Sequence, residues 1–121
     1  MIDETRKILR IPDLPVTATC VRVPVMNSHS VSITAELERD FDLEELKEAL
    51  GNFAGMVLVD DVNSNEYPLA SDATGQDKVL VGRVRRDFST EKGINLWVVA
   101  DNIRKGAATN AVQIAELFRG M

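Results

Sequence analysis

The chain has 121 residues, of which 45% are hydrophobic and 27% are charged, and its net charge at pH 7 is −5. This length fits one domain with a modest core, and the acidic balance disfavours nucleic acid or an acidic membrane surface as a partner. Because the sequence has no apolar run of the ~20 residues that span a bilayer, no apolar leader and only one cysteine, we expect a cytoplasmic protein.

The first quarter of the sequence predicts a helix and a strand. Apolar residues at helical spacing favour a helix over residues 2–10, and the two prolines in residues 11–15 end it. Residues 16–26 are rich in β-branched side chains and predict a strand with alternate valines on one face. Pro24 has no N–H to donate to a neighbouring strand, so we expect a sheet edge or a bulge there.

A turn, a second strand and a helix follow. Residues 27–28 favour a two-residue turn, and residues 29–38 alternate between apolar and polar side chains. That alternation predicts a strand that is buried on one face. Asp42 and Glu45 form a helix-start signal, apolar residues from Leu43 to Phe53 follow at helical spacing, and Gly51 is a plausible C-terminal stop.

The rest of the chain predicts three more strands and a C-terminal helix. Residues 55–61 and the pair 78–88 and 93–101 read as strands, with a polar loop over 61–77. A helix is expected over 106–119, burying Ala107, Ala111, Ile114, Ala115 and Phe118. Strand pairs joined by tight turns, with few helices, predict an α+β fold in which helices cover a mixed, mainly antiparallel sheet.

The stretch TCVRVPVMNSHS, residues 19–30, carries the main chemical candidates. Arg22 lies among valines, and its planar fork suits an external carboxylate or phosphate, an acidic residue of the same chain, or solvent. His29 is the only histidine, and it serves either as an acid or base near neutral pH or as an ordinary turn residue. In a simple hairpin the two residues share one sheet face about 13 Å apart, which leaves room for a small anion.

Other groups in the sequence give weaker signals. Cys20 has no neighbouring histidine or helix N-terminus in sequence, and we interpret it as a buried structural cysteine. Arg83, Arg85 and Arg86 form a basic cluster that faces solvent or an interface, or binds an anion. The sequence has no glycine-rich nucleotide pattern and no metal-ligand spacing, so we expect no metal.

Four stretches of the sequence resemble the C-terminal part of the bacterial aspartate-semialdehyde dehydrogenase family. They are ETRKIL at 4–9, PDLPVTATCVRVPVMNSHS at 12–30, VGRVRRD at 81–87 and INLWVVADNIRKGAATNAVQIAEL at 94–117. The resemblance runs along nearly the whole chain. It implies a fold like that of the C-terminal domain of glyceraldehyde-3-phosphate dehydrogenase-like enzymes.

This resemblance also implies a reaction and roles for three residues. The reaction is the NADPH-dependent reductive dephosphorylation of L-aspartyl-4-phosphate to aspartate semialdehyde, toward lysine, threonine, methionine and diaminopimelate. It implies that Arg22 binds the substrate carboxylate, that His29 is the catalytic acid/base and that Asn102 contacts NADP. Complete members bind NADP mainly through an N-terminal Rossmann domain, carry a thioester-forming cysteine and form homodimers.

The chain departs from complete members in two elements. It has neither their glycine-rich fingerprint nor the Asn-Cys element of the nucleophile, and Cys20 belongs to the arginine strand instead. We therefore interpret residues 1–121 as a catalytic and dimerisation domain without its Rossmann domain, inactive alone. Two alternatives stay open: a non-catalytic dimerisation or interaction module of the same fold, and a related acyl-phosphate reductase.

Overall fold

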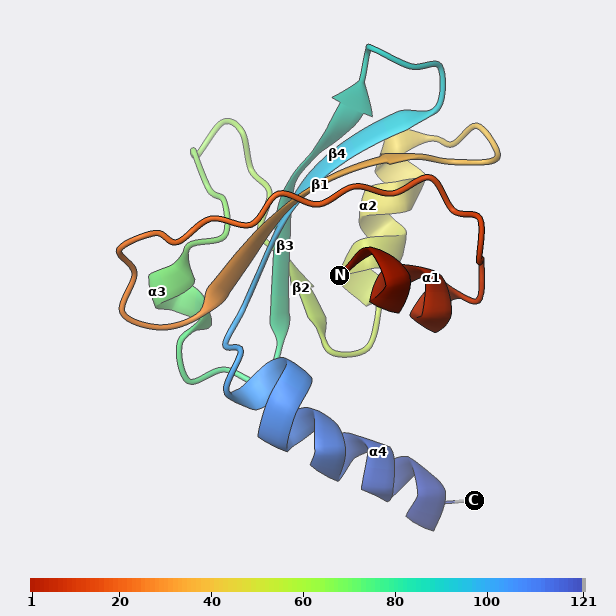
Figure 1. Cartoon of the computed structure of the whole chain (residues 1–121). Helices are drawn as coiled ribbons and strands as arrows, with labels where there is room; N and C mark the ends of the chain where they lie inside the picture. Colours follow the sequence, from red (N-terminus) through yellow and green to blue (C-terminus); the bar gives the residue numbers. More distant parts are fainter. Residues whose placement is uncertain (121) are drawn as a thin grey trace.

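The computed structural model describes residues 1–120, which fold around one four-stranded sheet (Figure 1). The strands lie in the order β1-β4-β3-β2. β2 runs parallel to β3, and the other two pairings are antiparallel. The strands are β1 His29–Glu36, β2 Met56–Leu58, β3 Val79–Asp87 and β4 Gly93–Ala100. The predicted α+β class with a mixed, mainly antiparallel sheet is therefore confirmed.

β1 and β4 pair along their full lengths. His29 lies opposite Ala100 at one end, and Glu36 lies opposite Gly93 at the other. One-sided burial sets this register, because a slip by one residue would turn every apolar side chain of β1 to the other face. Three apolar side chains of β1 are half-buried: Val31, Ile33 and Ala35. Of these, Ala35 packs against the buried cluster beneath α2.

Helix α2, Leu43–Asn52, covers one face of the sheet. Asp42 caps it as the sequence predicts, because its carboxylate accepts the N–H groups of Glu44 and Glu45 at 2.9 and 3.0 Å. The leucines of α2 pack against a buried cluster of Val81, Val84 and Ile94. α2 and the short helix α3 lie on opposite sides of the sheet (Figure 1).

The predicted polar loop over residues 61–77 contains helix α3, Ala70–Ala73, which the sequence pattern did not indicate. Four residues are too few to show a helical period, so only the contacts reveal this helix. Its Ala73 is fully buried and packs with Leu80 and Val99, on the face that α2 leaves open. The loop before α3 approaches β3 so closely that a Cβ on Gly82 would stand 2.5 Å from Pro68 Cδ.

β3 contains a β-bulge between Gly82 and Arg85. The extra residue lies in this interval, where Arg83 has a φ of 55°, in the left-handed region. The Asp60 carboxylate accepts the N–H groups of Arg83 and Val84 at 2.7 and 3.2 Å. The bulge directs Val84 into the core beneath α2, while Arg83 and Arg85 stay exposed.

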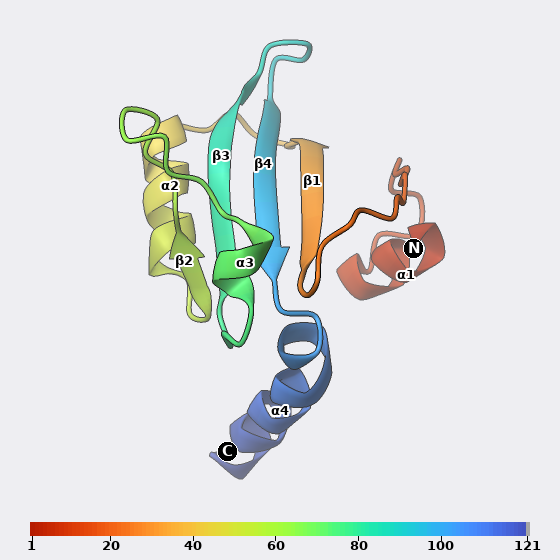
Figure 2. The same ribbon diagram turned by 90° about the vertical axis from the view of Figure 1, so that its left-hand side faces the viewer.

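The predicted strand over residues 16–26 is wrong. Helix α1, Ile2–Leu9, forms as expected, but residues 14–25 pair with no strand and lead from α1 to the start of β1 (Figure 2). Pro24 cannot donate to a ladder, and the expected hairpin at 27–28 does not form. The valines that predicted a buried face remain 75, 58 and 49% exposed at Val21, Val23 and Val25.

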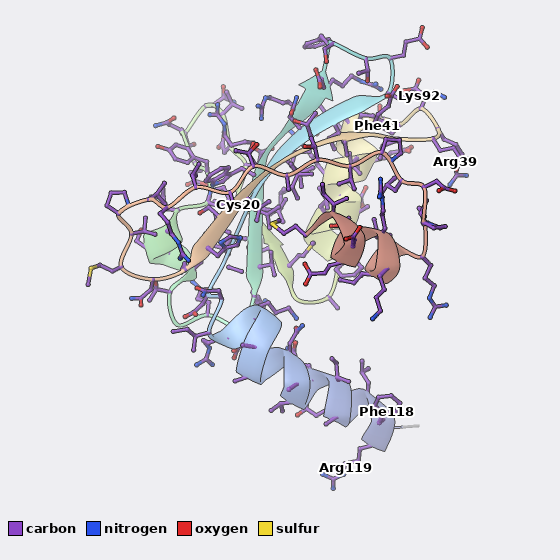
Figure 3. All side chains as sticks on the ribbon, viewed as in Figure 1. Cys20, Arg39, Phe41, Lys92, Phe118 and Arg119 are labelled. Carbon is purple, nitrogen blue, oxygen red and sulfur yellow. The ribbon has the colours of Figure 1, made fainter. Side chains whose placement is uncertain are left out.

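The C-terminal helix predicted over 106–119 forms as a regular helix only from Thr109, and its predicted burial is wrong. A kinked segment, η1 Arg104–Ala108, leads into α4, Thr109–Arg119, and neither contains a buried residue. α4 projects from the end of the sheet (Figure 2), and Phe118 lies near its free end (Figure 3). A helical period indicates an apolar face without indicating what covers it. Within residues 1–120, no helix has the length and apolar character to cross a membrane.

Replacing Asp60 with alanine is expected to lower the free energy of unfolding by about 2–4 kcal/mol. The change leaves two N–H groups of the bulge without an acceptor and removes the carboxylate that lies 3.5 Å from Lys47 Nζ. Urea denaturation of the 121-residue chain measures the change. The control is Asp72→Ala on α3, where the carboxylate is exposed and a change within about 0.5 kcal/mol is expected. Equal losses in the two variants would contradict the assigned role of Asp60.

Candidate functional site

Two of the three residues singled out in the sequence lie at the same end of the sheet. His29 begins β1 there, opposite Ala100, and Asn102 follows Ala100 by two residues. The turn after α3 reaches this end as well, because Thr74 Oγ1 lies 3.1 Å from Ser28 Oγ. The antiparallel ladder thus brings together residues that are 73 positions apart in the sequence, counted from His29 to Asn102.

The main chain at His29 is held on both sides. His29 pairs with Ala100 in the ladder, and the residue before it, Ser28, has a φ of 74°. A serine rarely adopts this left-handed conformation, so local contacts must hold it, and the contact with Thr74 is one of them. The His29 side chain itself is exposed. An imidazole placed this way can exchange protons with a bound molecule or with water.

Asn102 lies on a turn that is anchored by its neighbour. Asp101 is buried, and its carboxylate accepts the N–H groups of Gly75 and Ile103 at 2.8 and 3.0 Å. These bonds, led by the one from Gly75, hold the pKa of Asp101 below its ordinary value. The side chain of Asn102 is exposed. The turn therefore presents an amide outward from a fixed main chain, which suits a hydrogen bond to a ligand.

Arg22 is not brought onto the sheet. It lies in the unpaired segment before β1, and its side chain is exposed. Because the hairpin is absent, the expected separation from His29 along one strand face does not apply. The salt bridges of the described chain do not include Arg22, so pairing with an acid of the same chain does not account for it. Its guanidinium is open to solvent or to a group from outside these residues.

A bidentate ion pair that the sequence pattern did not reveal lies beside this turn. Arg104 Nε and Nη2 donate to the two carboxylate oxygens of Asp77 at 2.8 and 2.9 Å. Thr109 Oγ1 donates to the same carboxylate at 2.7 Å. The bonds from Arg104 and Thr109 hold the pKa of Asp77 at about 2. Asp77 belongs to the region read as a polar loop, where no periodicity distinguishes a structural carboxylate from a solvated one.

The sheet face opposite α2 carries an open groove of about 720 Å³. Its lining includes Val23, Val25, Ser30, Ser32, Arg83 and Arg85. The basic cluster seen in the sequence is therefore divided between the two faces. The Arg83 guanidinium lies 5.9 Å from the ring centre of Tyr67, whereas that of Arg86 lies 4.2 Å from the Phe41 ring, near α2. Arg86 is held against the Phe41 ring and paired with Asp40, whereas Arg83 and Arg85 remain available to a ligand or partner.

The interpretation of Cys20 as a buried residue is wrong. Cys20 is exposed, and its Sγ lies 3.1 Å from Met1 Sδ at the start of α1 (Figure 3). Among residues 1–120, no three side chains of the His, Cys, Asp or Glu type gather where they could hold a metal ion. The described part of the chain thus offers an acid/base group and a cationic group, without an activated nucleophile.

Comparison with known proteins gives a consistent family. Residues 1–105 match the family described as semialdehyde dehydrogenase, dimerisation domain. The chain is 54% identical over 118 residues to aspartate-semialdehyde dehydrogenase of Aquifex aeolicus, and the match covers 98% of the chain and 35% of that protein. It is 49% identical over 120 residues to the Bacillus subtilis enzyme of the same name, with the same two coverages.

A solved structure agrees with these sequence matches. The crystal structure of aspartate semialdehyde dehydrogenase II from Vibrio cholerae, complexed with ASA, has a TM-score of 0.89 and 50% sequence identity. The match covers 97% of this chain and 34% of that one. The chain therefore spans about a third of the length of the relatives that it matches.

Asp77 is expected to keep its negative charge well into the acid range. Because its pKa is about 2 in the folded chain against an ordinary 3.8, its contribution to stability is present above pH 3.8 and is lost as the pH falls through about 2. Following the carboxyl carbon of Asp77 by NMR during acid titration measures this midpoint. In the Arg104→Gln variant the midpoint is expected to rise toward 3.8. A midpoint that Arg104→Gln leaves unmoved would contradict the assigned cause.

Proposed function

Because the chain belongs to the semialdehyde dehydrogenase dimerisation-domain family, we propose that it is the C-terminal part of an aspartate-semialdehyde dehydrogenase. The whole enzyme would reduce L-aspartyl-4-phosphate with NADPH to aspartate semialdehyde and release phosphate, a step toward lysine, threonine, methionine and diaminopimelate. The observation that carries this proposal is the 54% identity across nearly the whole chain to an enzyme of that name.

Each of the three residues has chemistry that suits a role in this reaction. The open guanidinium of Arg22 would bind the substrate carboxylate through two parallel hydrogen bonds. The imidazole of His29 would take the proton from the attacking thiol and return a proton as the intermediate collapses. NADPH supplies the hydride when it is bound. Asn102, which is exposed on an anchored turn, would donate or accept a hydrogen bond at that cofactor.

The remaining parts of the active site would come from outside this chain. We assign NADP binding mainly to an N-terminal Rossmann domain, and the thioester-forming cysteine to the same missing part. That division agrees with the span of about a third of the relatives' length. It also agrees with the exposed position of Cys20 beside Met1. The dimerisation-domain family suggests that the enzyme is a homodimer.

The exposed apolar surfaces favour one alternative, an interaction module without catalysis. Among them are Val21 on the unpaired segment and Leu117 and Phe118 on α4, which are 75, 67 and 73% exposed. Such surfaces suit burial against another domain or subunit. An enzyme of several domains needs the same surfaces, so activity decides between the two proposals.

The full-length enzyme that contains this chain is expected to reduce NADP with aspartate semialdehyde, and only when phosphate is present. The 121-residue chain alone is expected to give no turnover, because it lacks the nucleophile and the Rossmann domain. NADPH absorbance follows the reaction in both cases. Absence of activity in the full-length enzyme would favour the interaction module. Phosphate-dependent turnover by the isolated chain, purified from a host without its own enzyme, would overturn the division of the site.

In the full-length enzyme, His29→Asn is expected to lower kcat by about 10²–10⁴-fold, since the variant keeps the polar shape but loses the proton-transfer group. The KM for aspartate semialdehyde should change much less. Steady-state kinetics measure both quantities, and sedimentation checks that the oligomeric state is unchanged. A kcat near that of the unmodified enzyme would remove His29 from the mechanism.

Arg22→Lys provides the contrasting variant for that experiment. It keeps the charge but replaces a bidentate fork by a single ammonium, so the KM for aspartate semialdehyde should rise about tenfold. If both kcat and KM stay unchanged, Arg22 does not bind the substrate. The opposite patterns expected in the two variants separate loss of proton transfer from loss of substrate binding.

A further inference from the structure

The turn after α3 has no role in the proposed function, yet it contacts the segments on both sides of the candidate site, the one before His29 and the one around Asn102. Its Thr74 hydroxyl lies 3.1 Å from that of Ser28, next to His29. Its Gly75 N–H donates to Asp101, next to Asn102. Its last residue, Asp77, binds Arg104 and Thr109 on the far side of Asn102.

Building on the proposed function, we propose that Asp77, acting through Arg104, is a positioning residue that holds the Asn102 turn in place for NADP. Neither Asp77 nor Arg104 needs to touch the cofactor. Asp77 uses both carboxylate oxygens on Arg104, and one of these also accepts the Thr109 hydroxyl.

The segment after Asn102 needs such a support because its backbone is irregular. Lys105, Gly106 and Ala107 leave the helical region, and Gly106 has a φ of 93°. A Cβ placed on Gly106 would meet no atom within 4 Å outside its chain neighbours, so nothing packs on that side of the glycine. The backbone bonds that cross this segment have the wider spacing of five residues, from the Ala108 N–H to the Ile103 carbonyl at 3.3 Å and from the Thr109 N–H to the Arg104 carbonyl. Ordinary α-helical bonds therefore do not fix its path.

Besides these bonds and the one from Lys105 Nζ to Gln113 Oε1 at 2.8 Å, two carboxylates restrain the segment from opposite ends. Asp101 fixes the start, because its side chain bonds the Ile103 N–H and its carbonyl oxygen accepts the Lys105 N–H at 2.8 Å. Asp77 fixes the end, because its Oδ1 atom binds both Arg104 Nε and Thr109 Oγ1. These last two residues begin η1 and α4, so one oxygen atom closes the kinked segment between them.

A role confined to global stability does not explain this geometry. The side chains of Arg104 and Asp77 are 43 and 47% exposed, and ion pairs at exposed positions contribute little to stability. A bidentate pair does restrict orientation strongly. The consequence of losing it should therefore appear in cofactor binding more than in unfolding.

The test compares Asp77→Asn with Asp72→Asn in the full-length enzyme. Each variant removes one exposed carboxylate, Asp72 on α3 and Asp77 in the turn that follows, but the Asp72 side chain bonds only Ser71 within the described residues. Asp77→Asn is expected to raise the KM for NADP about tenfold while leaving the KM for aspartate semialdehyde within about twofold. Asp72→Asn should leave both constants unchanged. The exchanged pair Asp77→Arg with Arg104→Asp should recover part of the affinity for NADP.

Three outcomes decide the proposal. A selective rise in the KM for NADP, partly reversed in the exchanged pair, supports it. Equal constants in Asp77→Asn and Asp72→Asn overturn it, and so does a proportional loss of kcat at unchanged KM values with a lowered melting temperature.

If the unmodified enzyme is inactive with NADP, the proposed function fails instead. The restraint can then be tested separately by hydrogen exchange in the 121-residue chain, at the amides of Ile103, Arg104, Lys105 and Ala108. If Asp77→Asn leaves their exchange rates unchanged, Asp77 does not restrain this segment and the proposal is overturned.

Discussion

The pairing of β1 with β4 determines where the candidate chemistry lies. This antiparallel register places His29 opposite Ala100 and so brings the only histidine to the turn that carries Asn102. The register follows from one-sided burial, because a shift by one residue would expose the apolar side of β1. The loops at this end then hold the main chain next to His29 and Asn102, through contacts at Ser28 and Asp101. The site is thus a product of strand pairing first and of side-chain contacts second.

Patterns in the sequence predicted the elements that bury one face within the chain. The alternation of β1 and the cap of α2 at Asp42 have their partners inside residues 1–120, and both predictions are confirmed. The same kind of pattern failed for residues 16–26 and for the burial of α4. Both places do carry an apolar face, but the described chain leaves about half or more of these side chains exposed. Periodicity reports that a face is apolar and cannot report where its partner is.

The residues that position the site escaped prediction for a different reason. Asp60, Asp77 and Asp101 each act on groups from a separate segment, two of them mainly on backbone N–H groups. Such contacts depend on how loops fold and leave no periodic trace in the sequence. His29 was singled out as the only histidine of the sequence and Asn102 by the family resemblance; their roles stay predictions, and their surroundings came only from the structure. Candidate residues are therefore easier to pick from a sequence than the contacts that surround them.

The bulge in β3 has a consequence for how this chain can change in length. Before it, Val81 faces the core beneath α2. After it, Val84 takes that face, three positions later instead of an even number. Deleting the extra residue would leave Val81 and Val84 two positions apart, so regular alternation would keep Val84 and Arg86 on their present faces, and the bulge bonded to Asp60 would be lost. Substitutions at Arg83 or Arg85, which are exposed, leave that order intact. The strand could thus lose its extra residue without changing which of its later side chains face the core.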